Sequence, residues 1–192
     1  MIIEQSFPNI LGAFESNGVR YDITSSLFGS YNVVNICAAL TVGKHFEIAY
    51  EDGVAAINGY RSTINRSERR VYKGAEIFLD AYNANPSSMQ LVIENFRNQE
   101  GNKVLVLGDM LELGADEIKE HKVILDLISD SHWNRVFIFG NLFSSVKDNY
   151  SQFEFFTEFE ELQKQFETLE FDSSSILMKG SRGMALERLL KG

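Results

Sequence analysis

The feature that most constrains the fold is an alternation of two hydrophobic periods that begins near residue 76. Short apolar runs separate segments in which apolar residues recur at helical spacing, as at Met89, Val92, Ile93 and Phe96. Strands are expected at 77–80, 103–107, 135–139 and 175–178, and helices from Pro86 and at about 115–129, 158–168 and 183–190. This alternation predicts an α/β domain with a mainly parallel sheet flanked by helices.

A glycine follows three of the expected strands. Gly108, Gly140 and Gly180 each stand directly after an apolar run. Glycine permits close approach of the backbone, and open α/β sheets bind ligands outside the carboxyl ends of their strands. The sequence therefore predicts a ligand site at the carboxyl edge of the sheet.

The first 60 residues have a different pattern. A strand is expected at 18–23, followed by helices at 32–44 and 51–60. The polar segment 61–73 carries five basic residues. It is interpreted as a solvated connection between domains, unless one of its arginines contacts a ligand.

Charge and composition narrow the class of partner. The 192 residues have a formal net charge of −9, so binding of nucleic acid or of an anionic membrane surface is not expected, because both need a basic face. The single cysteine, Cys37, excludes an internal disulfide and favours a reducing compartment. No apolar run reaches the roughly 18 residues of a membrane helix, and the first residues do not resemble a signal peptide. We therefore expect a cytoplasmic protein.

Two segments near the expected strand ends carry amides and carboxylates. The segment 80–89 places Asp80, Tyr82, Asn83 and Asn85 where they could bind ribose hydroxyls or a peptide backbone, although the asparagines would equally build a turn and a helix cap. The segment 108–114 carries two acids, which would either orient an amine or be merely solvated.

Two further segments combine backbone N–H groups with polar side chains. Residues 179–183, Lys-Gly-Ser-Arg-Gly, suit a corner that binds a carboxylate or a phosphate. Asn32 and Asn35, which open the long helix, are three residues apart and are expected to share a face. One of them would cap the helix while the other presents its amide outward.

Taken in order, three of these motifs resemble the Mur ligases. They are Tyr-Asn-Ala-Asn-Pro at 82–86, Gly-Asp-Met-Leu-Glu-Leu-Gly at 108–114 and Lys-Gly-Ser-Arg-Gly at 179–183. Within the family they are similar to members that add D-alanyl-D-alanine to UDP-N-acetylmuramoyl-tripeptide. The resemblance runs from about Leu27 to the C-terminus. It implies a Rossmann-like C-terminal domain and an ATP-dependent step of peptidoglycan synthesis that proceeds through an acyl phosphate.

The resemblance also implies roles for individual residues. Asn35 is similar to the residue whose amide reads adenine, Arg66 to the catalytic arginine that reaches the terminal phosphate, and Asp80 to the acid that binds the ribose. The residues implied to lie near the incoming dipeptide and the peptide end are Asn83, Asn85, Asp109, Ser181 and Arg182.

The chain departs from the family at two places. Tyr31 stands where a histidine is usual, and Gly-x-x-x-x-Gly-Lys-[Ser/Thr] does not occur. ATP phosphates and Mg²⁺ would be held by that loop and its neighbours, so those ligands are expected outside this chain and no metal site within it. Residues 1–73 are then expected to be the remnant of a P-loop ATP-binding central domain, and 74–192 the complete C-terminal domain.

Three interpretations remain. The chain is a part of a ligase, inactive without the missing N-terminal and central domains; or a stand-alone, non-catalytic Rossmann-like binding module; or a part of a sister ligase such as a folate-polyglutamate type. The Tyr-Asn-Ala-Asn-Pro segment argues against the third. The reading frame upstream of Met1 would separate the first two.

Overall fold

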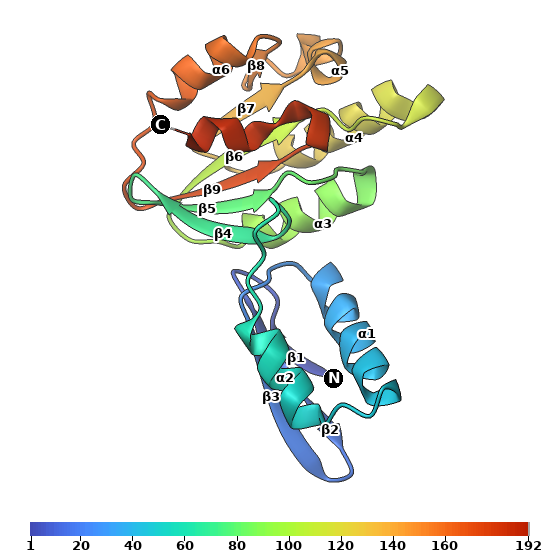
Figure 1. The fold of residues 1–192 in the computed structure, drawn as a ribbon. Coiled ribbons are helices and arrows are strands. Elements are labelled where there is room, and N and C mark those ends of the chain that lie inside the picture. Colours follow the sequence, from blue (N-terminus) through green and yellow to red (C-terminus); the bar gives the residue numbers. More distant parts are fainter. Residues whose placement is uncertain (192) are drawn as a thin grey trace. The chain divides into compact units, whose positions relative to one another are not determined.

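The chain forms two compact units in the computed structural model, which describes residues 1–191 (Figure 1). The first unit is Met1–Thr63 and the second begins at Ile64. The second unit starts earlier than the predicted boundary after residue 73. The reason is that β4 (Glu68–Tyr72), within the segment predicted to be a connection, pairs antiparallel with β5 (Ala75–Asp80).

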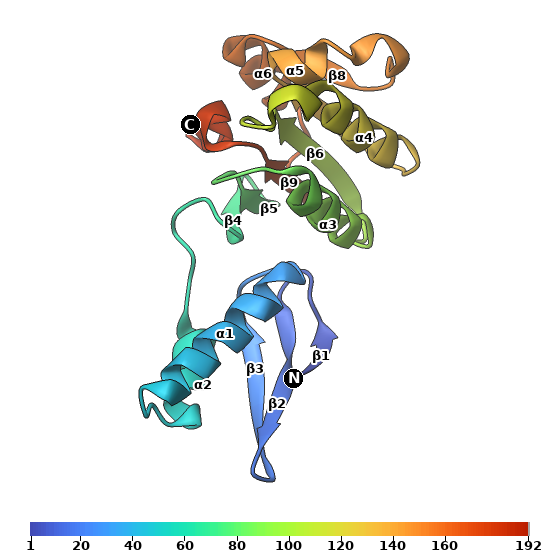
Figure 2. The same ribbon diagram turned by 90° about the vertical axis from the view of Figure 1, so that its right-hand side faces the viewer.

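The first unit is a three-stranded antiparallel sheet with two helices on one face (Figure 2). Its elements are β1 (Ile2–Gln5), β2 (Ile10–Ser16), β3 (Val19–Ser25), α1 (Tyr31–His45) and α2 (Tyr50–Gly59). The core joins Ile10 and Ile23 of the sheet to Ile36, Leu40 and Val54 of the helices. The predicted strand at 18–23 and both predicted helices are confirmed.

The second unit contains a six-stranded sheet in the order β4-β5-β9-β6-β7-β8. Its remaining strands are β6 (Asn102–Gly108), β7 (Arg135–Phe139), β8 (Glu154–Phe156) and β9 (Ser174–Lys179). All neighbours from β5 to β8 are parallel, and only the edge strand β4 is antiparallel. The predicted mainly parallel sheet is therefore confirmed, with β5, β6, β7 and β9 at the four predicted places.

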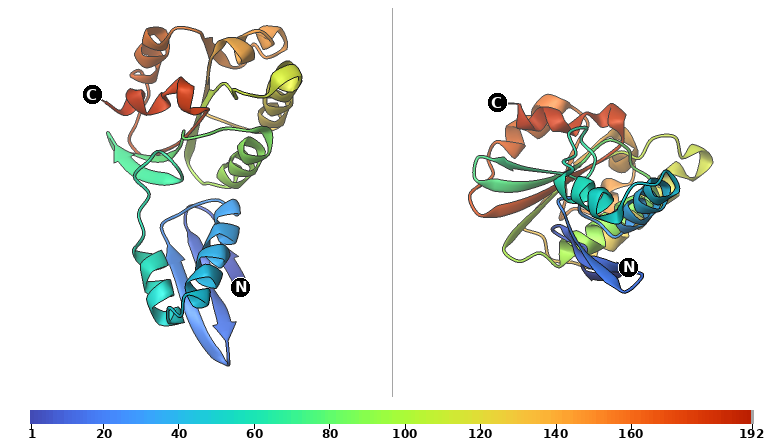
Figure 3. Two further views of the ribbon diagram at one scale, coloured as in Figure 1. Left: turned by 45° about the vertical axis from the view of Figure 1, so that its right-hand side comes forward. Right: turned by 60° about the horizontal axis from the view of Figure 1, so that its bottom comes forward.

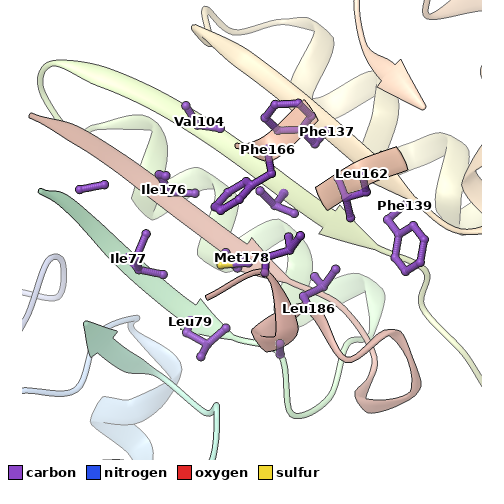
Figure 4. Packing of buried hydrophobic residues seen from close by; sticks show 14 of the residues in the cluster. Ile77, Leu79, Val104, Phe137, Phe139, Leu162, Phe166, Ile176, Met178 and Leu186 are labelled. Carbon is purple, nitrogen blue, oxygen red and sulfur yellow. The ribbon is translucent and has the colours of Figure 1, made fainter. Parts of the chain in front are cut away.

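Helices cover both faces of this sheet (Figure 3). They are α3 (Pro86–Arg97), α4 (Glu117–Ser129), α5 (Asn141–Ser144) and α6 (Phe159–Phe166), with short 3-10 segments η1 (Gly114–Asp116), η2 (Lys147–Asn149), η3 (Arg182–Met184) and η4 (Leu186–Leu190). Figure 4 shows Ile77 and Leu79 of β5 in the core with α6 and η4. Phe78, between them, faces the opposite way and contacts Phe96 of α3.

The last helix differs from its prediction. Residues 183–190 form two 3-10 segments instead of one α-helix, because Ala185 takes a left-handed conformation with φ 48° and interrupts the helix. Within residues 1–191 no helix combines the length and the apolar character that crossing a bilayer requires.

Candidate functional site

The carboxyl ends of β5 and β9 meet in a buried ion pair. The register of the two parallel strands sets Asp80 beside Lys179, and Lys179 Nζ lies 2.7 Å from Asp80 Oδ2. The lysine side chain is 1% exposed and the aspartate side chain 7%. Lys179 Nζ also donates to the main-chain oxygen of Asn83, at 3.1 Å. These additional bonds matter, because a buried ion pair is tolerated only when its polar atoms are satisfied.

The same ion pair holds the turn that carries Arg66. Asp80 Oδ1 accepts the N–H of Ser67 at 3.0 Å, and the N–H of Ala81 donates to Asn65 O at 2.8 Å. Asn65 and Ser67, on either side of Arg66, both have left-handed backbone conformations, with φ 58° and 48°. Such conformations are costly and persist where surrounding bonds impose them. The turn is therefore held in place, with Arg66 exposed at its tip.

Arg66, Asp80 and Asn83 are thus brought together at one edge of the second unit. The guanidinium carbon of Arg66 lies 5.9 Å from the centre of the Tyr82 ring, and 45% of Tyr82 is exposed. An exposed cation beside an exposed aromatic ring, on a rigid turn, suits the binding of an anionic ligand that also has a planar group.

The two asparagines of this edge have local structural bonds. Asn85 caps α3, because its Oδ1 accepts the N–H of Ser88 at 2.9 Å. In return, the Ser88 hydroxyl oxygen accepts the N–H of Asn85. Asn83 Oδ1 accepts the N–H of Ala84 at 2.9 Å. The interpretation of these residues as a turn and a cap is confirmed. A substrate contact by either amide stays a prediction.

Asp109 is buried and bound to main-chain N–H groups, which differs from the expected solvated acid in a loop. Its two oxygens accept the N–H groups of Leu142 and Phe143, each at 2.9 Å, at the start of α5. Only 3% of Asp109 is exposed. The carboxylate accepts N–H groups that a helix start leaves unsatisfied, and these bonds join the loop after β6 to the loop after β7. A substrate contact by Asp109 stays a prediction.

A buried histidine supports the same loop. His121 Nε2 accepts the N–H of Met110 at 3.0 Å, and His121 Nδ1 donates to Glu117 O at 2.6 Å. Both ring nitrogens are therefore used in hydrogen bonds within the protein. His121 is fully buried, so it supports the loop as a packed side chain.

The loops after β6 and β9 are fastened to each other. Ser181 Oγ accepts the N–H of Leu111 at 2.8 Å, and the N–H of Ser181 donates to Asp109 O at 3.0 Å. Arg182 takes no part in these hydrogen bonds between the loops. Its side chain is 57% exposed and pairs with Glu187 at 2.9 Å. The hydrogen bonds between the loops do not use the Ser181 hydroxyl proton or the Arg182 guanidinium, so both groups could bind an anion at this corner.

The glycines after the strands serve internal packing, which corrects the reason given for them. A side chain at Gly140 would overlap the carboxylate of Asp109, and a Cβ at Gly180 would lie 3.0 Å from the Cα of Gly108. The space beside these glycines is therefore filled by the protein itself, rather than kept open for a ligand.

Asn35 belongs to the first unit. Its Nδ2 donates to Asn32 Oδ1 at 3.0 Å, and Asn32 Nδ2 donates to Phe28 O at 2.8 Å. The shared face of the two asparagines is confirmed, but the expected cap is wrong, because Asn32 uses its amide on a carbonyl and the N-cap residue is Ser30. Asn35 borders a pocket of about 340 Å³ together with Leu27, Ile36, Ala39, Ala56, Ile57 and Tyr60.

Lys179 belongs to the segment 179–183 that was predicted to bind an anion, but its ammonium is instead buried against Asp80, a pairing that sequence reasoning missed. The available signal was a lysine that ends an otherwise apolar strand, which calls for a buried partner. In the part of the chain that the structure describes, no three His, Cys, Asp or Glu side chains gather as they would around a metal ion.

A mainly parallel sheet with polar groups gathered at its carboxyl edge defines an α/β ligand-binding domain. Residues 65–182 match the family model described as Mur ligase, glutamate ligase domain. The chain belongs to the Mur ligase family.

Relatives with known names cover nearly all of this chain. The UDP-N-acetylmuramoyl-tripeptide--D-alanyl-D-alanine ligase of Bacillus subtilis is 36% identical over a 190-residue alignment that covers 93% of this chain and 41% of the relative. A crystal structure of MurF from Acinetobacter baumannii has a TM-score of 0.86 and 25% identity, and covers 98% of this chain and 43% of its own. MurF from Thermotoga maritima, solved with ADP, has a TM-score of 0.80 at 21% identity, and covers 100% and 44%. The chain thus spans about two fifths of the length of these proteins.

Proposed function

We propose that this chain is the C-terminal part of an ATP-dependent ligase that joins D-alanyl-D-alanine to UDP-N-acetylmuramoyl-tripeptide. The observation that carries the proposal is the edge where Arg66, Asp80 and Lys179 meet, in a chain whose 36% identical relative bears that name. The missing part of the ligase would supply the P-loop, the Mg²⁺ ligands and the site for the uridine nucleotide.

In the proposed reaction the tripeptide carboxylate attacks the γ-phosphate of ATP and ADP leaves. The dipeptide amine then attacks the acyl phosphate, and phosphate leaves as the amide bond forms. Phosphoryl transfer depends chiefly on positioning and on neutralising charge. Arg66 is suited to this task because its turn is fixed from below by Asp80 and Ala81 while its guanidinium is exposed. Asp80 is proposed to contact the ribose at the same edge.

The incoming dipeptide is proposed to bind at the corner formed by Ser181 and Arg182. A dipeptide has a free carboxylate, and the exposed guanidinium of Arg182 is a suitable bidentate partner for it. The Ser181 hydroxyl already accepts the N–H of Leu111, so its own proton remains to be donated to a ligand oxygen. Asn83, on the neighbouring strand end, is proposed to bind the peptide portion.

Saturation-transfer NMR with D-alanyl-D-alanine tests this placement on the 192-residue chain. We expect a methyl signal that falls by at least about fivefold in Ser181→Ala, the equivalent of one hydrogen bond worth about 1 kcal/mol. Ser174→Ala is the matched control, because its hydroxyl donates to Glu170 O at the opposite end of β9. L-alanyl-L-alanine is expected to give the weaker signal. Equal signals from wild type and Ser181→Ala would count against the site.

A further inference from the structure

The pocket beside Asn35 is bordered by a side-chain amide whose oxygen and nitrogen have fixed positions. It lies between α1 and α2, which pack against each other in the first unit (Figure 2). Its lining is apolar except for the amide of Asn35 and the phenol of Tyr60. A planar, mostly apolar group with one polar edge fits such a lining. Which polar edge would be accepted depends on which end of the Asn35 amide is the oxygen.

The orientation of that amide follows from a chain of hydrogen bonds that begins at a main-chain carbonyl. Phe28 O can only accept, so the Asn32 atom 2.8 Å from it must be Nδ2. The other Asn32 atom is then Oδ1, which in turn requires a donor. The Asn35 atom 3.0 Å from it must therefore be Nδ2, and the remaining end of the Asn35 amide is Oδ1.

Reversing the Asn35 amide would set two oxygens against each other. The Asn32 amide cannot reverse to relieve this repulsion, because its own oxygen would then meet the carbonyl of Phe28. Asn32 is only 5% exposed, so water does not readily replace the lost bonds. The relay Phe28–Asn32–Asn35 thus leaves Asn35 with one acceptor and one remaining N–H for a ligand.

We infer that Asn32 determines base specificity by fixing Asn35 in the orientation that accepts a 6-amino group. The inference rests on the nucleotide-binding part of the proposed function. Adenine presents the 6-amino donor beside a ring-nitrogen acceptor, which complements Oδ1 and N–H of one amide. Hypoxanthine and guanine present a 6-oxo acceptor instead, which would face Asn35 Oδ1. A freely rotating Asn35 would accept either kind of base, so the discrimination resides in the buried Asn32.

Adenosine and inosine are the probes, because they differ at position 6 and need no phosphate site. Their dissociation constants for the 192-residue chain are measured from the backbone amide shifts of Ala39 and Ile57, which line the pocket. We expect adenosine to bind at least about fivefold more tightly than inosine. In Asn32→Leu the ratio is expected to fall below about 2, mainly because inosine binds better once Asn35 can turn.

Two further variants keep the test decisive if Asn32→Leu is unstable. Asn35→Leu, at an exposed position, should also abolish the preference. Asn9→Ala should retain it, because the Asn9 amide pairs with Gln5 outside the pocket. Equal binding of the two nucleosides by wild type, or a preference that survives in folded Asn32→Leu, would overturn the inference and leave the proposed function standing. Absence of any pocket shift with either nucleoside would instead overturn the base site itself.

Discussion

Replacing Lys179 with methionine should destabilise the second unit by about 3–5 kcal/mol, the usual result of removing one partner of a buried ion pair. The substitution deletes the 2.7 Å bond to Asp80 and the 3.1 Å bond to Asn83 O, and it leaves a carboxylate whose side chain is 7% exposed without its cation. A domain of this kind has about 5–15 kcal/mol of stability in total. Urea unfolding followed by Trp133 fluorescence measures the effect, since this single tryptophan lies in the second unit.

Arg135→Met is the matched control within the same sheet. Arg135 and Glu154 also form an ion pair, with both carboxylate oxygens engaged, but their side chains are 28% and 37% exposed. Its loss should cost about 1 kcal/mol or less. The double variant Asp80→Asn with Lys179→Met removes both charges and should be more stable than Lys179→Met alone. The reasoning fails if Lys179→Met costs no more than Arg135→Met.

Two other predictions follow from individual contacts. Gly140→Ala should destabilise the chain more than Gly101→Ala, as measured by urea unfolding. At Gly101, with φ 80°, alanine costs about 1–2 kcal/mol. Gly140 has φ 131° and ψ 166°, a region essentially restricted to glycine, and there the methyl would also displace the carboxylate of Asp109. Burial, together with the hydrogen bond to and the charge of Asp126, raises the pKa of Tyr150 from 10.0 to about 12. Tyr150 therefore contributes stability below pH 10 that is lost as the pH rises towards 12, and alkaline unfolding of Tyr150→Phe should lack this component.

The buried elements could be predicted because the spacing of their apolar residues indicates which faces of each strand or helix are buried. β5, β6, β7 and β9 are runs of apolar residues, and α3 has a cap, a proline and an apolar stripe. β4 was missed because Arg69 and Arg70 lie on an exposed edge strand, where charged side chains hide the strand period. The break at Ala185 was missed because alanine has a high helix propensity, and its left-handed conformation here is a tertiary effect that no local sequence pattern indicates.

The sequence indicated which strand ends carry the candidate residues, but not what each side chain contacts. Motif positions located the carboxyl edge, yet residue type alone does not tell whether an acid faces a ligand or the protein. Asp109 faces the N–H groups of α5, which are 33 and 34 residues away in sequence. The pairing of Asp80 with Lys179 spans 99 residues and depends on the strand order, so sequence spacing could not indicate it.

The position of β9 has a consequence for how the protein is made. β9 is the last strand in the chain, yet it lies between β5 and β6 in the middle of the sheet. A ribosome therefore releases β5 and β6 long before the strand that separates them, and the apolar edges of both must wait without a partner. Non-local parallel pairing of this kind is slow and exposes nascent chains to aggregation. A chain that stops before Ser174 contains β5 and β6 but not the strand that joins them, so the second unit can complete its core only after β9 has been synthesised.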